Sequence, residues 1–240
     1  MQPPLSPETI VGTSIEGQDV TWAQITSAAQ DVREWLALKL TSGSCSSGLI
    51  YQLAGHHCRI PQWFGERDLL VDIHEVYDQV GELEKAPLTR AAPTKRAEPF
   101  TAGPLQGLWH KHWFQADFLV TNLLNETEKN GEMLIRRRLD ETFGRDGWEG
   151  QILNKDLAGQ LAHVMVDGAL EHRAGRSKKS SRLTGEWIVF AKGRGGRNIY
   201  LTLAGHGETN EAIFKRCAFA PKEFPELSST LPFSNEQAAP

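Results

Sequence analysis

The segment Trp109–Phe114 places two histidines and a lysine among large aromatic side chains. In an extended chain, residues two apart share a face, so His110 and His112 would point the same way. Histidine titrates near neutral pH and suits proton transfer, and Lys111 can hold an anionic group. The segment is therefore a candidate acid–base centre. The alternative is an aromatic plug of the core whose polar tips lie at the surface.

The His-x-His spacing also occurs in metal sites, but a zinc site needs three or four converging ligands. The other candidate donors are His56, His57, Cys58, His163 and His206. Their spacing matches no standard zinc pattern, because the sequence contains neither HExxH nor CxxC. We therefore expect no metal and no cofactor. A zinc-dependent hydrolase using His110 and His112 is the weakest functional hypothesis.

A second polar set surrounds a predicted β-hairpin. Two runs rich in β-branched and aromatic residues, 186–191 and 198–203, flank the glycine-rich stretch 193–196. The polar residues of this region are Lys192, Arg194, Arg197, Thr202 and His206. Cations can hold a phosphodiester and stabilise its developing charge, and a histidine can move the proton of a ribose 2′-OH. The region thus predicts a phosphodiester site, and a surface hairpin with a basic turn is the alternative.

The segments 185–192 and 197–206, GEWIVFAK and RNIYLTLAGH, resemble the terminal hairpin of one group of bacterial and phage toxin-like nucleases. This is the barnase, EndoU, colicin and RelE-like group, called BECR. The resemblance implies a metal-independent ribonuclease, a hydrolase acting on RNA, with a cognate inhibitor protein as a further partner. It implies a catalytic site formed by Lys192, Arg197, Thr202 and His206, completed by His110 or His112.

A non-catalytic binding or assembly factor of phage or mobile-element type is the hypothesis from another class. It rests on an uneven charge distribution. Residues 1–85 contain 5 Lys and Arg against 12 Asp and Glu, whereas residues 86–240 contain 21 against 18. Residues 173–197 alone hold eight basic groups and one acidic group. Such a stretch is a candidate anion-binding surface or a solvated basic loop. Toxicity on expression would separate an effector from an assembly factor.

Helical apolar spacing predicts helices over 22–40, 66–84, 129–143, 155–172 and 210–218. The first begins at a predicted capping box formed by Thr21 and Gln24. The strand-rich runs after residue 185 predict the hairpin. The fold class is therefore α+β, with a helical N-terminal part, a small antiparallel hairpin or sheet, and a short C-terminal helix.

Composition suggests four parts of the chain. Residues 1–85 form an acidic helical region, and residues 86–104 are a linker with four prolines. Residues 105–225 form an α+β domain that carries the basic hairpin. Residues 226–240 are expected to be a tail.

The whole chain has a net charge of −4 and 40% apolar residues, which is typical of a globular protein. No apolar run approaches the roughly 18 residues of a membrane span, so no membrane partner is expected. The first residues lack the features of a secretory signal. Cysteines 45, 58 and 217 form no CxxC pair and fit a reducing compartment, for which the cytoplasm is the expectation.

We predict that the purified protein carries no structural or catalytic zinc, because its histidines and cysteines lack a zinc-ligand spacing. Elemental analysis of the full chain checks this. One stoichiometric zinc per chain would contradict it.

Overall fold

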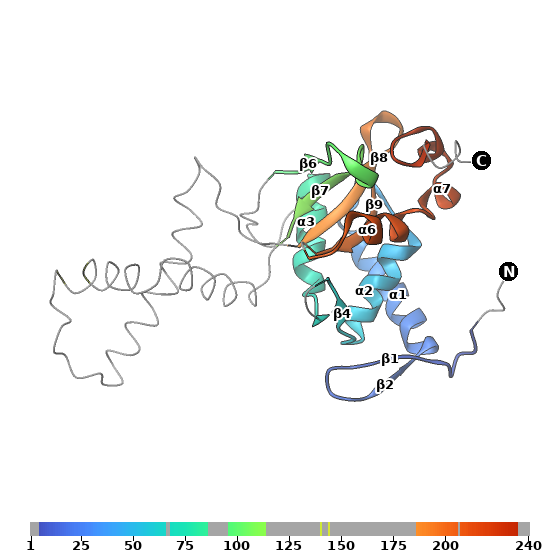
Figure 1. Cartoon of the computed structure of the whole chain (residues 1–240). Helices are drawn as coiled ribbons and strands as arrows, with labels where there is room; N and C mark the ends of the chain where they lie inside the picture. Colours follow the sequence, from blue (N-terminus) through green and yellow to red (C-terminus); the bar gives the residue numbers. More distant parts are fainter. Residues whose placement is uncertain are drawn as a thin grey trace. The chain divides into compact units, whose positions relative to one another are not determined.

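The computed structural model describes residues 5–65, 68–85, 96–113, 140, 144, 186–205 and 207–234. The chain divides into two compact units, one made of 1–114 with 185–240 and the other of 115–184. The helices and strands given below belong to the first unit (Figure 1). Residues on both sides of the 86–104 segment therefore belong to one unit. Apart from residue 140, the helices predicted over 129–143 and 155–172 lie outside the described residues.

The first unit has the predicted α+β character and is built on a five-stranded sheet in the order β3-β9-β8-β7-β6. The strands are β3 (Ser44–Cys45), β6 (Glu98–Pro99), β7 (Trp109–His112), β8 (Trp187–Lys192) and β9 (Asn198–Ala204). Strand β3 runs parallel to β9, and the other neighbours are antiparallel. The predicted hairpin is confirmed as β8 and β9 at the centre of this sheet.

The β8–β9 hairpin turns through the short 3₁₀ segment η2 (Arg194–Gly196). Gly195 and Gly196 have φ values of 69° and 80°, which side-chain-bearing residues rarely adopt. Further along, Phe190 pairs with Tyr200 and Val189 pairs with Thr202, so one extra residue bulges from β9. The bulge moves the residues after it to the opposite face of the sheet from the one that strict alternation would give.

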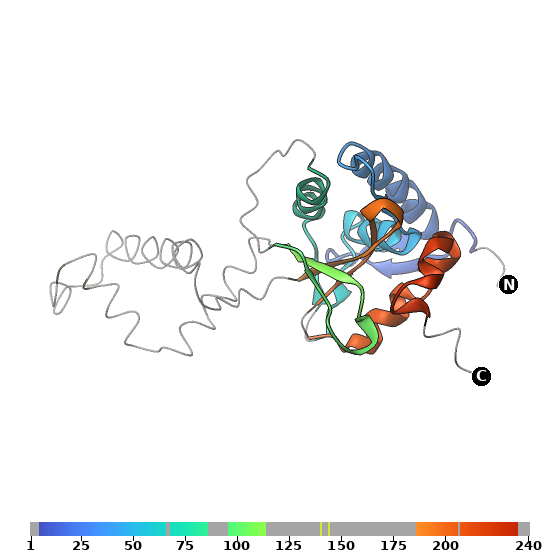
Figure 2. The same cartoon turned by 90° about the horizontal axis from the view of Figure 1, so that it is seen from above.

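Helices α1 (Trp22–Ala37), α2 (Ser47–His57) and α3 (Ile73–Glu84) lie on one side of the sheet (Figure 2). The predicted capping box is present, since the Thr21 side chain accepts from the Gln24 amide and the Gln24 side chain accepts from the Thr21 amide. Helix α2 was not predicted. It is buried on most sides, so it lacks the polar stripe by which a helix is recognised in a sequence.

Helix α3 is shorter than the predicted 66–84 helix. Strand β5 (Asp68–Leu69) pairs with β4 (Gln62–Trp63) before the helix begins. Asp72 then caps α3 by accepting a hydrogen bond from the His74 amide at 3.0 Å. The helix therefore begins at the Asp72 cap, although residues with helical apolar spacing continue before it.

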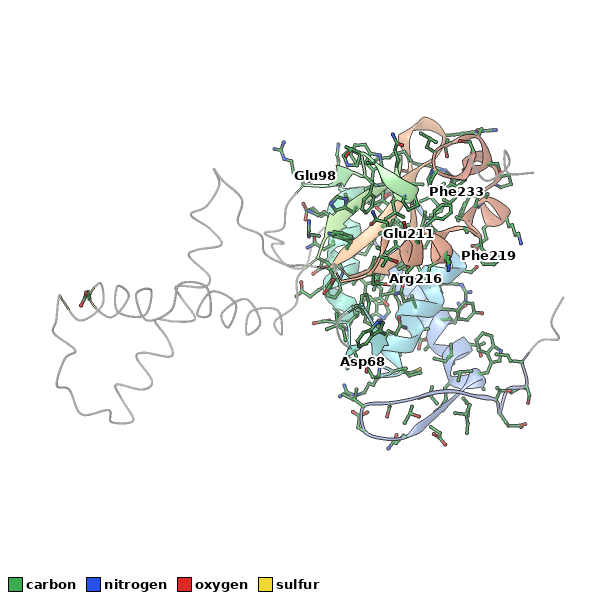
Figure 3. All side chains as sticks on the ribbon, viewed as in Figure 1. Asp68, Glu98, Glu211, Arg216, Phe219 and Phe233 are labelled. Carbon is green, nitrogen blue, oxygen red and sulfur yellow. The ribbon has the colours of Figure 1, made fainter. Side chains whose placement is uncertain are left out.

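The other side of the sheet carries η1 (Gly103–Leu105), α6 (Asn210–Cys217), α7 (Ala220–Glu223) and η3 (Pro225–Ser229). The core on this side contains Leu105, Leu108, Val189, Ala191, Ile199, Leu201, Ala204, Ile213, Cys217, Ala220, Leu227 and Phe233. Residues 226–240 are predicted to be a tail, yet Leu227 and Phe233 are buried here. Figure 3 labels Phe233 together with Phe219, which is 62% exposed.

Residues 1–85 are predicted to be helical, but they begin with a separate hairpin. Strands β1 (Ile10–Thr13) and β2 (Asp19–Thr21) form a two-stranded antiparallel sheet that leads directly into α1. Figure 1 shows it beyond the start of α1, away from the five-stranded sheet.

A buried carboxylate joins the helices to the sheet. Glu84 ends α3, and one of its oxygens accepts from the backbone amides of residues 41, 42 and 43 at 2.9 to 3.1 Å. Its other oxygen accepts from Tyr200 at 2.8 Å and from Asn198 at 3.0 Å. A Cβ on Gly43 would lie 2.5 Å from that carboxylate, so the loop closes only with glycine there.

Burial by itself would raise the pKa of the Glu84 carboxyl. The hydrogen bonds from Ser42, Gly43, Tyr200 and Asn198 outweigh burial and lower that pKa to about 2. The folded chain therefore strongly prefers the ionised form, and the carboxylate acts as a charged anchor between α1, α3 and β9.

We predict that Glu84→Gln lowers the free energy of unfolding by about 3 kcal/mol near pH 7, because an amide cannot accept from every donor around it. Urea denaturation measures this. The exposed Glu34→Gln in α1 is the matched control and should change stability by less than about 0.5 kcal/mol.

The same comparison has a defined pH dependence. The folded pKa of Glu84 lies below its unfolded value, so the stabilisation is complete above about pH 4.5 and is lost as the pH falls toward about 2. The difference in the free energy of unfolding between wild type and Glu84→Gln should therefore become smaller as the pH falls from about 4.5 to about 2. A difference in unfolding free energy that does not change with pH would contradict the role of ionised Glu84 as an anchor.

Candidate functional site

The turn end of the β8–β9 hairpin carries an exposed lysine held by aromatic rings. Lys192 Nζ donates to Asn198 Oδ1 at 2.6 Å. It also lies 5.4 Å from the ring centroid of Trp109 and 5.2 Å from that of Phe190. Cation–π contacts of this kind contribute about 0.5–1 kcal/mol at exposed positions. The ammonium is therefore placed at one point of the surface while keeping further N–H donors for a ligand.

The two arginines of the turn are in different situations. Arg197 forms an ion pair with Glu226, and its guanidinium lies 3.4 Å from Ser44 Oγ. Arg194 is exposed and makes no hydrogen bond within the described part of the chain. The pKa of Glu226 is lowered, first by its hydrogen bond to Arg197 and also by the charge of Arg194. Of the two, Arg194 keeps its donors for a ligand.

Trp109 completes this end of the sheet. It pairs with Phe190 across β7 and β8, with ring centroids 6.3 Å apart, and it is only partly buried. Trp109, Lys192 and Arg194 together form what we call the turn-end platform. One aromatic ring and two cations are thereby presented at the same end of the hairpin.

The platform is connected to the Glu84 anchor. Asn198 accepts from Lys192 and donates to Glu84 at 3.0 Å, so one amide bridges the surface cation and the buried anion. Desolvation against the rings lowers the pKa of Lys192, while the Glu84 carboxylate opposes that shift. The position of Lys192 therefore depends on the same carboxylate that joins α3 to the sheet.

Thr202 lies in the interior, at the bulge of β9, and is 2% exposed. Its hydroxyl lies 2.9 Å from Gln52 Oε1 and accepts from Arg216 Nε at 3.2 Å. Arg216 projects from α6, where Figure 3 labels it, and also pairs with Glu208. These contacts give the hydroxyl hydrogen-bond partners inside the fold, and the buried side chain is not accessible to an external ligand.

His110 and His112 share one face of β7, as the sequence predicts, with ring centroids 5.5 Å apart. His110 also lies 4.6 Å from the ring of Phe100 and 5.2 Å from that of Trp187. Phe100 and Trp187 pack against the core on the α6 side of the sheet. The two imidazoles therefore lie on the face opposite Lys111.

Lys111 is 1% exposed and donates to Glu82 of α3 at 3.0 Å. Alternation along β7 puts it on the helical side of the sheet, with Trp109 and Lys192. The anionic group predicted for Lys111 is therefore found within the chain. An external anion has no access to this ammonium.

The predicted catalytic residues thus fall into separate places. Lys192 and Arg197 flank one turn. His110 pairs with Val189, three residues before Lys192, so it lies roughly 10 Å along the strand and on the other face. His206 lies outside the described residues. The catalytic roles themselves stay predictions.

Sequence reasoning did not single out Trp109, Asn198 or Glu84 as parts of a site. Trp109 stood out only within its aromatic run, and no local signal joins it to Lys192, because β7–β8 pairing brings them together from distant parts of the chain. Glu84 looks like an ordinary acidic helix end in the sequence.

Within the described ranges, no three histidine, cysteine, aspartate or glutamate side chains gather closely enough to hold a metal ion. Among the described helices, none combines the length and apolar character needed to cross a membrane. No protein family, curated protein or solved structure matches this chain.

We predict that Thr202→Val lowers the free energy of unfolding by about 1–3 kcal/mol, because Arg216 loses a buried acceptor. Thermal and urea denaturation measure this, and Thr26→Val in α1, whose hydroxyl bonds only to Ala23, is the control. Unchanged stability in Thr202→Val would contradict a structural role for the hydroxyl.

Proposed function

We propose that this chain binds single-stranded RNA through the turn-end platform of Trp109, Lys192 and Arg194. The observation that carries the proposal is the Lys192 ammonium, held at the surface over Trp109, with the exposed Arg194 in the same turn. Proteins bind single strands by pairing cations with phosphates and by stacking unpaired bases on aromatic rings. The platform offers both kinds of contact.

The donors of the platform suit a phosphate. Lys192 uses one of its three N–H bonds on Asn198, and Arg194 has five donors for a ligand. Arg197 does not add a free charge, because Glu226 neutralises it. Two phosphate contacts predict a salt dependence with a slope of roughly −1.4 in log K against log salt. Because the whole chain has a net charge of −4, an RNA strand is attracted to this local basic surface and not to the protein as a whole.

The choice of RNA rests on the hairpin's resemblance to toxin-like nucleases of the BECR group. Three free cysteines agree with a reducing compartment such as the cytoplasm, where RNA is abundant. The resemblance also implies cleavage, which is the second candidate. Binding is what the described geometry supports best, because Lys192 lies with Trp109 on one face of the sheet and the two histidines lie on the other.

Cleavage of RNA is the second candidate function. It is favoured by the neighbouring rings of His110 and His112, since two imidazoles can give and accept protons in one reaction. An inhibitor protein as a partner belongs to this candidate. A binding or assembly factor needs neither cleavage nor an inhibitor.

The test is fluorescence anisotropy with a labelled single-stranded RNA of mixed sequence and the full chain. Lys192→Ala and Arg194→Ala should each weaken binding about 5- to 20-fold. Each change removes one phosphate contact, so the slope of log K against log salt should become shallower by about 0.7. Trp109→Leu should weaken binding by a similar factor with little change in salt slope, because stacking is not ionic. Lys215→Ala, an exposed lysine on α6, is the matched control.

Equal losses in Lys192→Ala and Lys215→Ala would show non-specific attraction and contradict the proposal, as would no binding at low salt. Cleavage of the same RNA is measured in parallel. If His110→Ala and His112→Ala abolish cleavage while binding is kept, the second candidate is supported. An intact RNA after prolonged incubation with wild type refutes it.

A further inference from the structure

The β1–β2 hairpin exposes apolar side chains that the rest of the fold does not cover. Ile10 is 57% exposed, Ile15 is 51% exposed and Val11 is 38% exposed. Single exposed apolar residues are ordinary on a protein surface. Here three β-branched residues stand within six positions of one small hairpin, which marks it as a candidate interaction surface.

The hairpin is held in place by one side only. Val20 of β2 is buried, and the Ile15 amide donates to the Arg59 carbonyl at 3.0 Å. A Cβ on Gly12 would lie 2.9 Å from Ile60 Cδ1, so β1 packs closely on that residue. The hairpin therefore presents its exposed residues from a fixed base and does not need to reorganise to bind.

The outer edge of β1 carries no charged side chain, whereas β2 contains Asp19. Strands β1 and β2 pair only with each other within the described chain. Natural proteins shield such edges with charged residues, prolines or bulges. Ile10–Thr13 contains neither a charged residue nor a proline, and its one irregularity is the register shift between Ile10 and Gly12. An extended peptide that adds as a third strand would satisfy the unpaired backbone groups and cover the exposed side chains.

Charge indicates which peptide fits. Residues 5–21 contain Glu8, Glu16 and Asp19 and no lysine or arginine. The neighbouring Arg59 pairs with Glu16, so the other two carboxylates are not offset by it. A surface of this sign repels nucleic acid and disfavours a second copy of the same hairpin. It favours a basic partner.

We propose that the β1–β2 hairpin binds an extended segment of another protein, in which lysine or arginine alternates with β-branched residues, by addition of a strand. The basic residues lie against Glu8 and Asp19, and the β-branched residues cover Ile10 and Ile15. This surface is separate from the turn-end platform, and its occupation does not depend on RNA binding.

The test uses the full chain and three labelled peptides in fluorescence anisotropy. One alternates lysine and valine, one alternates glutamate and valine, and one is the lysine peptide with alternate backbone nitrogens methylated. Wild type should bind the lysine peptide at least tenfold more tightly than either of the others. Methylation removes backbone donors but keeps the charge, so it separates strand addition from simple attraction.

Two variants sharpen the test. Glu8→Lys with Asp19→Lys should reverse the preference toward the glutamate peptide. Ile10→Ser with Ile15→Ser should weaken binding of the lysine peptide at least fivefold. Leu38→Ser, a change at another exposed apolar residue, should leave this binding unchanged. Circular dichroism confirms that each variant is folded.

Equal binding of the lysine peptide and its methylated form would overturn the proposal, because charge alone would then explain the affinity. So would unchanged binding to the serine variant, or no binding of the lysine peptide at millimolar concentration. Loss of RNA binding in Lys192→Ala leaves these outcomes unaffected, so the two proposals are distinguishable.

Discussion

The ionised carboxylate of Glu84 connects the parts of the described unit that the chain itself keeps far apart. Through one side chain it holds the loop that follows α1, the end of α3 and the centre of β9. A buried charge is stabilising only when donors surround it, and here backbone amides, an amide side chain and a phenol do so. Asn198 then extends the network to Lys192 at the surface. The candidate binding surface therefore depends on the same interaction that stabilises the fold.

The alternation of the sheet separates the other polar residues. Neighbouring positions on β7 face opposite layers, so Lys111 meets α3 while His110 meets the aromatic rings on the α6 side. The bulge in β9 adds a local exception, which draws Thr202 into bonds with residues of α2 and α6. The five-stranded sheet thus presents a basic, aromatic surface at the hairpin turn, and the separate β1–β2 sheet presents an acidic, apolar one.

Elements with strong local signals could be predicted from the sequence. The capping box at Thr21, the β8–β9 hairpin and helix α6 follow from side-chain spacing, turn glycines and β-branched residues. Helix α2 could not be predicted, because a helix buried on most sides shows no period of polar residues. The segment after residue 225 is predicted to be a tail. It is ordered because Leu227 and Phe233 enter a core formed by distant strands.

The sequence by itself determined which groups this protein can use: two histidines on one face of an extended strand, and a cluster of cations at a glycine turn. Tertiary structure decided which of them meet. It placed Lys192 over Trp109, enclosed Lys111 against Glu82 and tied Arg197 to Glu226. Local sequence limits the conformation of each segment, but strand pairing between residues far apart in the chain sets every distance across the sheet.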